Sequence, residues 1–325
     1  MKTIRWGMIG CGAVAEKKSG PAFNKADHSR LVGVFARNAE RAGDYARRHG
    51  VPRVYDSALE MVNDPEIDAV YIATPPVFHK EYALLCAKHA KAAYLEKPMA
   101  MNYGECQEIA SVFKNAGIPL FVAFYRRAME KFLKVKELVG RKAIGDIRCV
   151  NVVLHQPPDK TDFARDHLPW RVLPQIAGGG KCLDMGIHTI DFLDDLFGPI
   201  EEVRAIAANQ AGLYEAEDIV TAAWRHASGV QATGSWCYTC FDNRDEVEIA
   251  GSGGRIRFEF FSDKPVIIKT KDGVRELKYP DPQHVQQPFI QTVVNDLLGI
   301  GKCPGDPESA ARASWVMDQL LRGRL

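Results

Sequence analysis

The sequence predicts a two-domain α/β protein, in which a doubly wound parallel sheet precedes an α/β domain with a mostly antiparallel sheet. Short apolar runs alternate with helical stretches from Ile4 to Phe124, which is typical of a parallel sheet. A glycine-rich turn follows the first run, and strand-like runs with short connections fill residues 200–280. Because 325 residues are too many for one compact core, we expect domains 1–122 and 123–325, with the last helix able to pack back on the first.

The first strand begins at Ile4 and runs into Gly10-Cys11-Gly12-Ala13-Val14-Ala15, a G-x-G-x-x-A pattern. Gly10 permits a tight turn, Gly12 lets a pyrophosphate approach the backbone, and Ala15 lets the next helix lie close to the sheet. The start of that helix offers free N–H groups and the positive end of its dipole to phosphates. A plain glycine turn is the alternative, but the position between a strand and a helix favours a Rossmann dinucleotide site.

The second strand, Arg30 to Ala36, ends where the adenosine ribose lies in such sites. NAD sites usually carry Asp or Glu there, about 20 residues past the glycines, to bind the ribose 2′-hydroxyl. This chain has Ala36 and Arg37, with Arg41 one helical turn later. The pattern favours a 2′-phosphate and therefore NADP, with NAD as the alternative cofactor. Two solvated arginines at a helix start are the competing interpretation.

Further strands and helices alternate through the first domain. Ser57 and Asn102 each stand three residues before a glutamate, which predicts capping boxes at two helix starts. The expected strands are Val54–Tyr55, Ala69–Thr74, Ala92–Glu96 and Leu120–Phe124. The continuous apolar run at 69–74 predicts a strand buried on both faces.

The second domain begins with a helix and a long strand, Ile147–His155. Residues 156–181 form an irregular stretch, and a loop this long in a compact protein is usually functional or disordered. A helix is expected from Leu183 to Phe197, followed by seven strand-like runs and two closing helices near 288–298 and 307–321. Short turns between the runs, including Asp272-Gly273, predict a largely antiparallel sheet.

Lys97 follows a strand, at the carboxyl edge where parallel sheets bind ligands. A lysine there reaches a bound sugar or nicotinamide, and its charge favours the deprotonated form of a nearby hydroxyl. The alternative is a structural lysine that pairs with Glu96.

Asp184 and His188 are four residues apart on a predicted helix, so they share a face. A carboxylate one turn from a histidine holds the tautomer of its ring and tunes its pKa, as acid–base catalysis requires. The alternative is a helix whose polar face, including Asp191, lies toward water.

Composition excludes several classes of function. With 42 basic and 41 acidic residues, the net charge of +1 gives no reason to expect nucleic-acid or membrane partners. No apolar run is long enough to span a bilayer and no signal peptide is evident, so we expect a cytoplasmic protein with reduced cysteines. Cys237 and Cys240 have metal-like spacing, but in a strand they would point to opposite faces, so no metal site is expected.

Seven motifs in order along nearly the whole chain make it resemble the glucose–fructose oxidoreductase and inositol dehydrogenase (Gfo/Idh/MocA) family. They are GCGAVA at 10–15, ATPPVFH at 73–79, EKP at 96–98, YRR at 125–127, WR at 170–171, GGG at 178–180 and DMGIH at 184–188. The resemblance implies a large open-faced second sheet, a cis Lys97–Pro98 bond, and hydride transfer between NAD(P) and a carbohydrate-like alcohol or ketone. It assigns Lys97, His188 and Asp184 to catalysis, the histidine as proton donor or acceptor.

The resemblance also implies two sets of binding residues. The cofactor contacts are expected at Gly10, Gly12, Ala13, Val14, Ala36, Arg37, Arg41, Thr74, Pro75, His79, Glu96, Lys97, Trp170 and Arg171. The substrate contacts are expected at Lys97, Tyr125, Arg126, Arg171, Asp184 and His188. Residues 156–168 match no known pattern and are expected to shape substrate choice.

The open sheet predicts a homodimer or homotetramer joined through residues 200–280. Dihydrodiol or xylose dehydrogenase activity is an alternative within the same enzyme class. A non-catalytic nucleotide-sensing regulator is the alternative from another class, but such proteins are expected to lose Lys97 or His188, and both are present.

Overall fold

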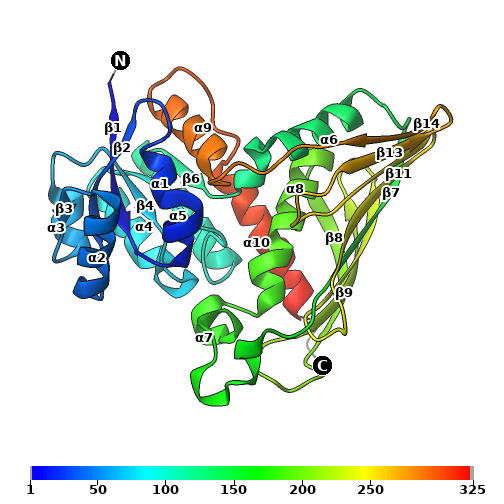
Figure 1. Ribbon diagram of the computed structural model, residues 1–325, viewed down its shortest axis with the longest axis horizontal. Helices are drawn as coiled ribbons and strands as arrows, with labels where there is room; N and C mark the ends of the chain where they lie inside the picture. Colours follow the sequence, from blue (N-terminus) through cyan, green and yellow to red (C-terminus); the bar gives the residue numbers. More distant parts are fainter. Residues whose placement is uncertain (1, 323–325) are drawn as a thin grey trace. The chain divides into compact units, whose positions relative to one another are not determined.

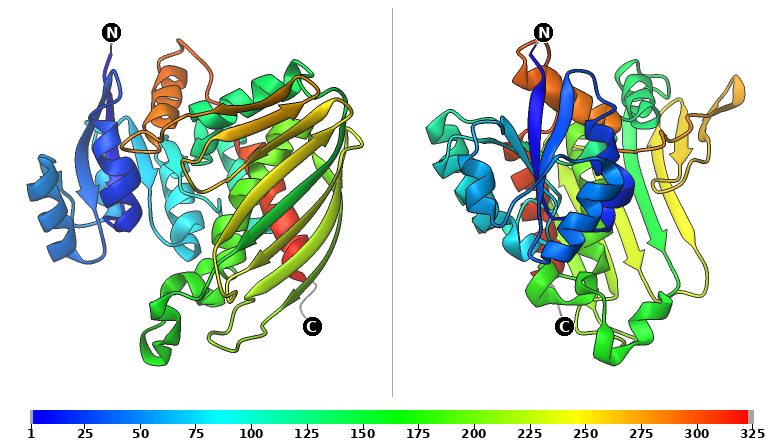
Figure 2. Two further views of the ribbon diagram at one scale, coloured as in Figure 1. Left: turned by 45° about the vertical axis from the view of Figure 1, so that its right-hand side comes forward. Right: turned by 60° about the vertical axis from the view of Figure 1, so that its left-hand side comes forward.

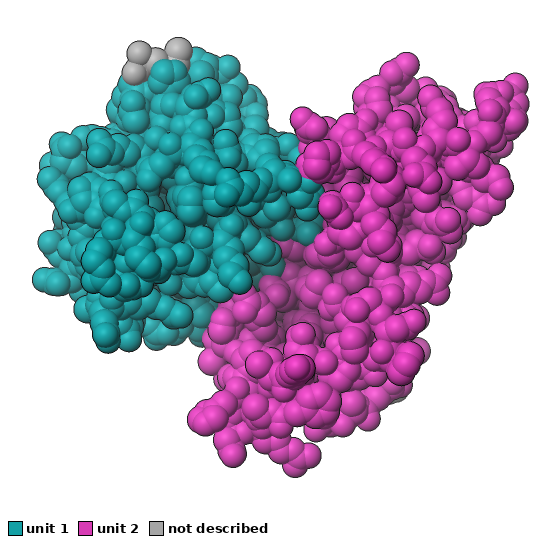
Figure 3. Space-filling model, viewed as in Figure 1, with its two compact units in different colours: residues 1–129, 281–311 teal, residues 130–280, 312–325 magenta. Residues whose placement is uncertain are grey.

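The computed structural model describes residues 2–322, which form two compact units (Figures 1 and 3). The first unit contains the chain up to Met129 together with Asp281–Ala311, called here the return segment. The second contains Glu130–Pro280 and the chain from Arg312 onward. The units therefore differ from the expected domains 1–122 and 123–325. One reason is that Arg127 is held in the first unit, where its guanidinium donates to the carbonyl of Pro304 at 2.7 Å.

The first unit is built on a six-stranded parallel sheet in the order β3-β2-β1-β4-β5-β6, as the alternating sequence pattern predicts. Its strands are β1 Ile4–Ile9, β2 Ser29–Phe35, β3 Arg53–Val54, β4 Ala69–Ile72, β5 Ala92–Leu95 and β6 Leu120–Val122. Every residue of β4 and β5 is buried, as expected for central strands covered on both faces.

Helices cover both faces of this sheet (Figure 2). A π-helical turn, Ala15–Ser19, leads into α1 Gly20–Phe23, and the other helices are α2 Ala39–His49, α3 Ala58–Asn63, α4 His79–Lys88 and α5 Tyr103–Ala116. The N-caps predicted from sequence are present, because Ser57 accepts from the Glu60 N–H at 3.1 Å and Asn102 from the Glu105 N–H at 3.0 Å. The reciprocal half of each capping box is displaced by one residue, since Glu60 accepts from the Asp56 N–H at 2.9 Å and Glu105 from the Met101 N–H at 3.2 Å.

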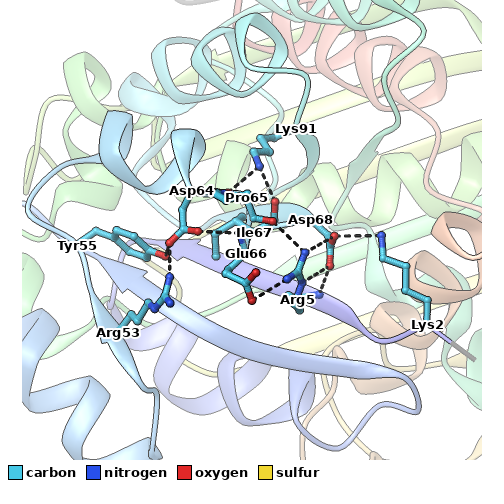
Figure 4. Close-up of polar contacts among 10 residues, drawn as sticks. All are labelled: Lys2, Arg5, Arg53, Tyr55, Asp64, Pro65, Glu66, Ile67, Asp68 and Lys91. Carbon is cyan, nitrogen blue, oxygen red and sulfur yellow. Dashed lines mark hydrogen bonds and ion pairs between the residues drawn. The ribbon is translucent and has the colours of Figure 1, made fainter.

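An ion-pair and hydrogen-bond network fastens the amino ends of the strands (Figure 4). Arg5 of β1 donates from Nε to Asp68 Oδ2 at 2.9 Å, just before β4. Lys91, just before β5, donates to the carbonyls of Asp64 at 2.9 Å and Ile67 at 2.6 Å. These polar groups lie at the edge opposite the carboxyl ends, which leaves the carboxyl edge free for function.

The return segment completes the core of the first unit. Its helix α9, Gln287–Leu297, places Phe289 against Tyr94 of β5 with ring centroids 5.9 Å apart. Tyr94 in turn stacks on Tyr71 of β4 at 5.1 Å, and all three rings are fully buried. The last helix, α10 Pro307–Arg322, begins in this unit and continues into the second. No helix within residues 2–322 is both long and apolar enough to cross a membrane.

The second unit is built on an eight-stranded sheet in the order β14-β13-β12-β11-β7-β10-β9-β8. Only the β7–β10 pair is parallel, so the sheet is mostly antiparallel, as predicted. The strands are β7 Ile147–His155, β8 Ile200–Ala208, β9 Ile219–His226, β10 Gln231–Cys237, β11 Arg244–Gly251, β12 Gly254–Phe258, β13 Val266–Thr270 and β14 Gly273–Leu277. The last hairpin turns at Lys271 and Asp272, because Gly273 already pairs with Thr270.

Helices α6 Glu130–Gly140 and α8 Ile187–Phe197 cover one face of this sheet, and the other face is bare (Figures 1 and 2). Phe132 of α6 and Phe192 of α8 contact each other with centroids 5.1 Å apart, and both lie against Phe258 of β12. Trp224 and Trp236 stack on the same covered side and are buried. The large aromatic residues of the sheet therefore form its core and do not lie on the open face.

The stretch from 156 to 181 contains short helical turns at Lys160–Phe163, Arg165–His167 and Trp170–Val172, then α7 Pro174–Ala177. Lys181 fastens it, since its ammonium donates to Asp159 Oδ2 at 2.7 Å and to Asp162 Oδ2 at 2.5 Å. The helix expected from Leu183 starts instead as a π-helical turn, Cys182–Gly186, and becomes α-helical at Ile187.

The expected divergence of Cys237 and Cys240 is wrong. The strand β10 ends at Cys237, and the bend at Tyr238 and Thr239 turns the chain back. Cys240 therefore lies outside the strand, and burial, together with a smaller effect of the nearby Cys237, raises the pKa of the Cys240 thiol to about 11. Within residues 2–322, no group of three His, Cys, Asp or Glu side chains has a metal-binding arrangement.

Candidate active site

The glycine turn after β1 has the geometry that its sequence predicts. Gly10 has φ of +104°, and a Cβ on it would lie 2.7 Å from the carbonyl oxygen of Ala73, so only glycine fits. A Cβ on Gly12 would meet no atom of the described chain within 4 Å. Ala15 is fully buried, which lets the following helix lie close to the sheet. Gly10 is thus required by the fold, and Gly12 leaves open space beside the backbone.

This edge fits a dinucleotide. The loop after β4 begins with Thr74 and Pro75, next to the glycine turn, and the Ala73 N–H donates to the carbonyl of Ile9 at 2.8 Å. The hydroxyl of Thr74 is buried and has no hydrogen-bond partner among residues 2–322. An unpartnered hydroxyl beside an open glycine backbone is the kind of group that a bound phosphate or ribose satisfies.

The end of β2 places a basic group next to a small residue. Ala36 follows the strand directly, and the exposed Arg37 guanidinium stacks over the ring of Phe78 at 4.0 Å. Arg41 lies in the first turn of α2, where its N–H donates to the Asn38 side chain at 2.8 Å. No carboxylate occupies the position that usually binds the ribose 2′-hydroxyl in NAD sites.

His79 lies behind this edge and not on its surface. It is fully buried, with Nε2 2.8 Å from the Thr74 carbonyl and Nδ1 2.9 Å from the Pro98 carbonyl. Burial lowers the pKa of His79, and the backbone contacts partly oppose this shift. In this position His79 joins the loop after β4 to the loop after β5, so its contribution to a cofactor site is through the backbone.

Lys97 follows β5 at the same carboxyl edge. Its side chain is in a half-buried position, and the Lys97–Pro98 peptide bond is cis, as the resemblance implied. The neighbouring Glu96 carboxylate is buried, and its Oε2 accepts from the Lys97 N–H at 3.2 Å. The end of β5 and the hydrogen bond from the Lys97 N–H to the Glu96 carboxylate fix the backbone from which the lysine side chain extends.

Tyr125 and Arg126 follow β6 in a short 3₁₀ turn, Tyr125–Ala128. Both are buried, and the Arg126 guanidinium donates to the Tyr125 hydroxyl at 2.9 Å. The carboxyl ends of β4, β5 and β6 therefore bring Thr74, Lys97 and Tyr125 to one edge of the first unit.

In the second unit, Asp184 is held by the WR motif. Arg171 donates from Nε to Asp184 Oδ2 at 3.1 Å, and its guanidinium lies over the Trp170 ring at 4.5 Å. Asp184 belongs to the π-helical turn, a form often seen at functional sites. The Asp184 side chain keeps 26% of its surface exposed, so it remains accessible to a ligand.

His188 and Asp191 are buried, with 5% and 1% exposure, so the alternative of a polar helix face toward water is wrong. The His188 ring lies edge-on to Phe261 with centroids 6.3 Å apart. Gly186, between Asp184 and His188, is also tightly packed, because a Cβ there would lie 3.2 Å from the Trp236 indole nitrogen.

Sequence reasoning missed two residues of the first unit that contact the predicted site. Phe78, which supports Arg37, lies within the motif at 73–79, but a ring stacked on a guanidinium has no sequence signal. Gln286 donates from Nε2 to Glu96 Oε1 at 2.6 Å, across 190 positions of sequence. It lies in an irregular segment without any motif, so only the fold identifies it.

Comparison with known proteins identifies the family. The model of the oxidoreductase family with an NAD-binding Rossmann fold matches residues 4–124, and the Gfo/Idh/MocA C-terminal domain model matches residues 132–257. The chain belongs to the Gfo/Idh/MocA family of oxidoreductases, as its motifs indicated. It is an enzyme with a nicotinamide-dinucleotide-binding domain.

Among individual proteins, an oxidoreductase of Formosa agariphila is 37% identical over 97% of both chains. The trans-1,2-dihydrobenzene-1,2-diol dehydrogenase of Mus musculus is 28% identical over 73% of this chain and 68% of its own. A levoglucosan dehydrogenase solved with NADH and levoglucosan has a TM-score of 0.89, with 22% identity over 99% of this chain and 97% of that chain. A 3-ketoreductase of Actinomadura kijaniata, solved with NADP and TDP-benzene, has a TM-score of 0.86 at 21% identity, covering 99% and 98%. At these identities the solved structures support the fold.

Proposed function

We propose that this protein is an NADP-dependent dehydrogenase or reductase that interconverts a secondary alcohol and a ketone on a sugar, polyol or related carbohydrate. The observation that carries the proposal is the position of Lys97 at the carboxyl edge of the dinucleotide-binding sheet. There it follows β5, next to β4 with the buried Thr74 hydroxyl at its end and two strands from β1 with the open Gly12 turn. In sheets of this kind the carboxyl edge binds the dinucleotide.

The cofactor preference rests on the end of β2. Ala36 offers no carboxylate to a ribose 2′-hydroxyl, whereas Arg37 and Arg41 supply two cations within one helical turn. Arginine binds phosphate through charge-assisted hydrogen bonds, and the contact with Phe78 holds the Arg37 plane in place. We therefore assign the 2′-phosphate of NADP to these two side chains.

The proposed chemistry assigns separate tasks to the nicotinamide and to the side chains. When bound, the nicotinamide supplies or accepts the hydride. The Lys97 ammonium stabilises negative charge on the substrate oxygen, and His188 gives or takes the proton of that oxygen. Asp184 holds and tunes the acid–base group, while Arg171 maintains the Asp184 carboxylate in its orientation. Positioned acid–base catalysis of this kind contributes roughly 10²–10⁴-fold to the rate.

Cofactor titration tests the first part of the proposal. We expect NADPH to bind at least about tenfold more tightly than NADH, because charge-assisted hydrogen bonds to the extra phosphate are available only to NADPH. Ala36→Asp places a like charge beside that phosphate and is expected to erase or reverse the preference. Glu40→Gln, one residue before Arg41, is a matched surface control. Equal dissociation constants for NADPH and NADH in the unmodified protein contradict the assignment.

A panel of substrates tests the second part. Polyols, aldoses, ketoses and anhydrosugars should be offered with NADP or NADPH, with hydride transfer followed at the absorbance of the reduced nicotinamide. The similarity to trans-1,2-dihydrobenzene-1,2-diol dehydrogenase favours a second candidate substrate, a cyclic trans-diol, which belongs in the same panel with xylose. NADPH binding without turnover of any of these compounds would favour the non-catalytic, nucleotide-sensing alternative.

We also propose that the enzyme acts in the cytoplasm as a homodimer or homotetramer. All eight cysteines are free thiols, which supports a reducing compartment. The bare face of the second sheet supports self-association, because an uncovered sheet face that carries exposed apolar side chains such as Ile206 is typical of an interface.

A further inference from the structure

A chain of buried hydrogen bonds crosses the parallel sheet of the first unit and includes a side chain from the return segment. The Ser19 hydroxyl lies 2.8 Å from that of Tyr71, and Tyr71 donates to Glu96 Oε1 at 2.7 Å. Gln286 Nε2 donates to the same oxygen at 2.6 Å, and Gln286 Oε1 accepts from the Tyr94 hydroxyl at 2.8 Å. All five side chains are buried.

The donors in this chain all point toward the carboxylate. An ionised Glu96 only accepts, so the protons of Tyr71 and of the Gln286 amide are both directed at Oε1. Ser19 then donates to the Tyr71 oxygen, which lies closer at 2.8 Å than the Val14 carbonyl at 3.3 Å. The Tyr94 hydroxyl fixes which end of the Gln286 amide faces Glu96. These hydrogen bonds together hold the Glu96 carboxylate in place.

The other carboxylate oxygen reaches the backbone of the proposed catalytic lysine. Glu96 Oε2 accepts from the Lys97 N–H at 3.2 Å, next to the cis bond to Pro98. The Pro98 carbonyl is in turn 2.9 Å from His79 Nδ1. The orientation of the Glu96 carboxylate therefore sets the backbone from which Lys97 extends.

We propose that Gln286 is a positioning residue for catalysis, which fixes Glu96 and through it the placement of Lys97 at the carboxyl edge. The inference rests on the proposed catalytic role of Lys97. It gives the return segment a function besides packing, because this late part of the chain supplies the amide that completes the Glu96 environment. Ser19 connects the same environment to the helix that follows the glycine turn.

The test compares two glutamines of the same segment. Gln286→Leu removes the side-chain hydrogen bonds to Glu96 and to Tyr94. Gln291→Leu is the matched control on α9. Gln291 accepts from the Asp27 N–H at 2.7 Å and donates to Asn295 at 3.0 Å, away from Glu96. Three quantities are measured for each variant: the NADPH dissociation constant, kcat and KM with the best substrate of the panel, and the rate of Lys97 acetylation by acetic anhydride, read from peptide masses.

We expect Gln286→Leu to lower kcat by about tenfold or more, since small displacements of a catalytic group are costly. The acetylation rate of Lys97 should change by at least about threefold, because the environment that sets lysine reactivity is altered. NADPH binding should change less than about threefold, because the glycine turn and arginines hold the nucleotide. Gln291→Leu should leave kcat and Lys97 acetylation unchanged.

A second variant keeps the test informative if Gln286→Leu is poorly folded. Gln286→Glu places a new carboxylate against Glu96, and two carboxylates so close share one proton, which raises the pKa of one of them. At low pH the proton shared by the two carboxylates takes the place of the amide N–H as the hydrogen-bond donor to Glu96. At high pH both carboxylates are ionised and repel each other. The kcat of Gln286→Glu relative to the unmodified protein should therefore fall as pH rises. If Gln286 has only a structural role, Gln286→Glu lowers the stability of the protein, but the ratio of its kcat to that of the unmodified protein does not change with pH.

The outcomes separate the inference from the function on which it depends. If the unmodified protein turns over no substrate, the proposed function fails before any variant is compared. Suppose instead that the unmodified protein is active. If both Gln286 variants then have the same kcat and Lys97 acetylation rate as the unmodified protein, and if the kcat ratio of Gln286→Glu does not change with pH, the positioning role of Gln286 is overturned. Loss of kcat confined to the Gln286 variants, with NADPH binding retained, supports it.

Discussion

Arg171 donates a hydrogen bond from Nε to Oδ2 of Asp184 at 3.1 Å, so a loop residue orients the carboxylate expected to act on substrate. Asp184→Ala removes both the charge and the acceptor. We expect KM to rise about tenfold and one limb of the pH–rate profile to shift, because the neighbouring acid–base group loses its partner. Asp184→Asn should fall in between, because it keeps an acceptor for Arg171.

The control for this experiment is Asp195→Asn, which removes a charge from the same helix at its ion pair with Lys136. Its steady-state constants should equal those of the unmodified protein. Equal effects of Asp184→Ala and Asp195→Asn would show that Asp184 has no special role.

Lys97→Ala and His188→Ala test the two other proposed catalytic groups. Each should lower kcat by about 10²-fold or more, and His188→Ala should flatten one limb of the pH–rate profile. Lys91→Ala is the control for the lysine, because Lys91 precedes the same strand and bonds only to backbone carbonyls at the opposite edge. Steady-state kinetics should show a slow Lys97 variant and an active Lys91 variant, and thermal unfolding should show that the Lys91 variant is the less stable of the two. Normal kcat in both catalytic variants would exclude the proposed mechanism.

The two glycines of the dinucleotide turn should separate folding from binding. Gly10→Ala forces a Cβ to within 2.7 Å of a backbone oxygen at φ of +104°, so we expect it to lower Tm or prevent folding. Gly12→Ala meets no protein atom within 4 Å, so the fold should be unaffected, while the new methyl group occupies the space proposed for the pyrophosphate. Thermal unfolding and NADPH titration check this. Undiminished NADPH binding by Gly12→Ala would contradict the proposed location of the cofactor.

Acid should weaken the first unit through Asp68. Burial alone would raise its pKa, but hydrogen bonds from Arg5 and Lys2 outweigh burial and lower the pKa of Asp68 to about 2 (Figure 4). The unfolded value is about 3.9, so the ionised pair stabilises the fold by about 2 kcal/mol above pH 4, and this contribution is lost as pH falls toward 2. Urea unfolding at several pH values should show that Asp68→Asn is less stable at pH 7 and that its difference from the unmodified protein shrinks in acid.

The matched control is Asp44→Asn, which removes an exposed carboxylate paired with Arg48 on α2. Solvent screens such pairs, so this change should have little effect on stability at any pH. A pH-independent difference between Asp68→Asn and the unmodified protein would contradict the assigned pKa shift.

Self-association is expected through the centre of the bare sheet face. Strands β8, β9, β10 and β7 align two rows of side chains there, which are small or uncharged except for Arg204 at the β8 end, and Ile206 is 62% exposed. The rows are Arg204, Ala223, Thr233, Asn151 and Ile206, Thr221, Ser235, Val153. Thr221→Arg places a charge in the middle of this surface and should produce monomers, whereas Lys269→Glu on β13 should not. Sedimentation of the unmodified protein as a monomer at micromolar concentration would exclude this interface.

Several features followed from local sequence because local chemistry decides them. Alternation of apolar runs and amphipathic helices predicted the parallel sheet, and Ser57 and Asn102 predicted helix starts that the structure contains. Gly10 and Gly12 predicted a turn whose φ and open space agree with their expected roles. These features depend on residues within a few positions of each other, so a single sequence contains the information.

The tertiary structure decided the features that depend on distant residues or on accumulated bends. Cys240 lies outside the sheet because β10 ends at Cys237 and the chain bends at Tyr238 and Thr239. His79 is buried between two backbone carbonyls, and Gln286 reaches Glu96 only because the chain returns to the first unit after the second sheet. Periodicity and spacing carry no information about such contacts, because the free energy that selects them comes from packing and hydrogen bonding between separate elements, and Gln286 and Glu96 are 190 residues apart in sequence.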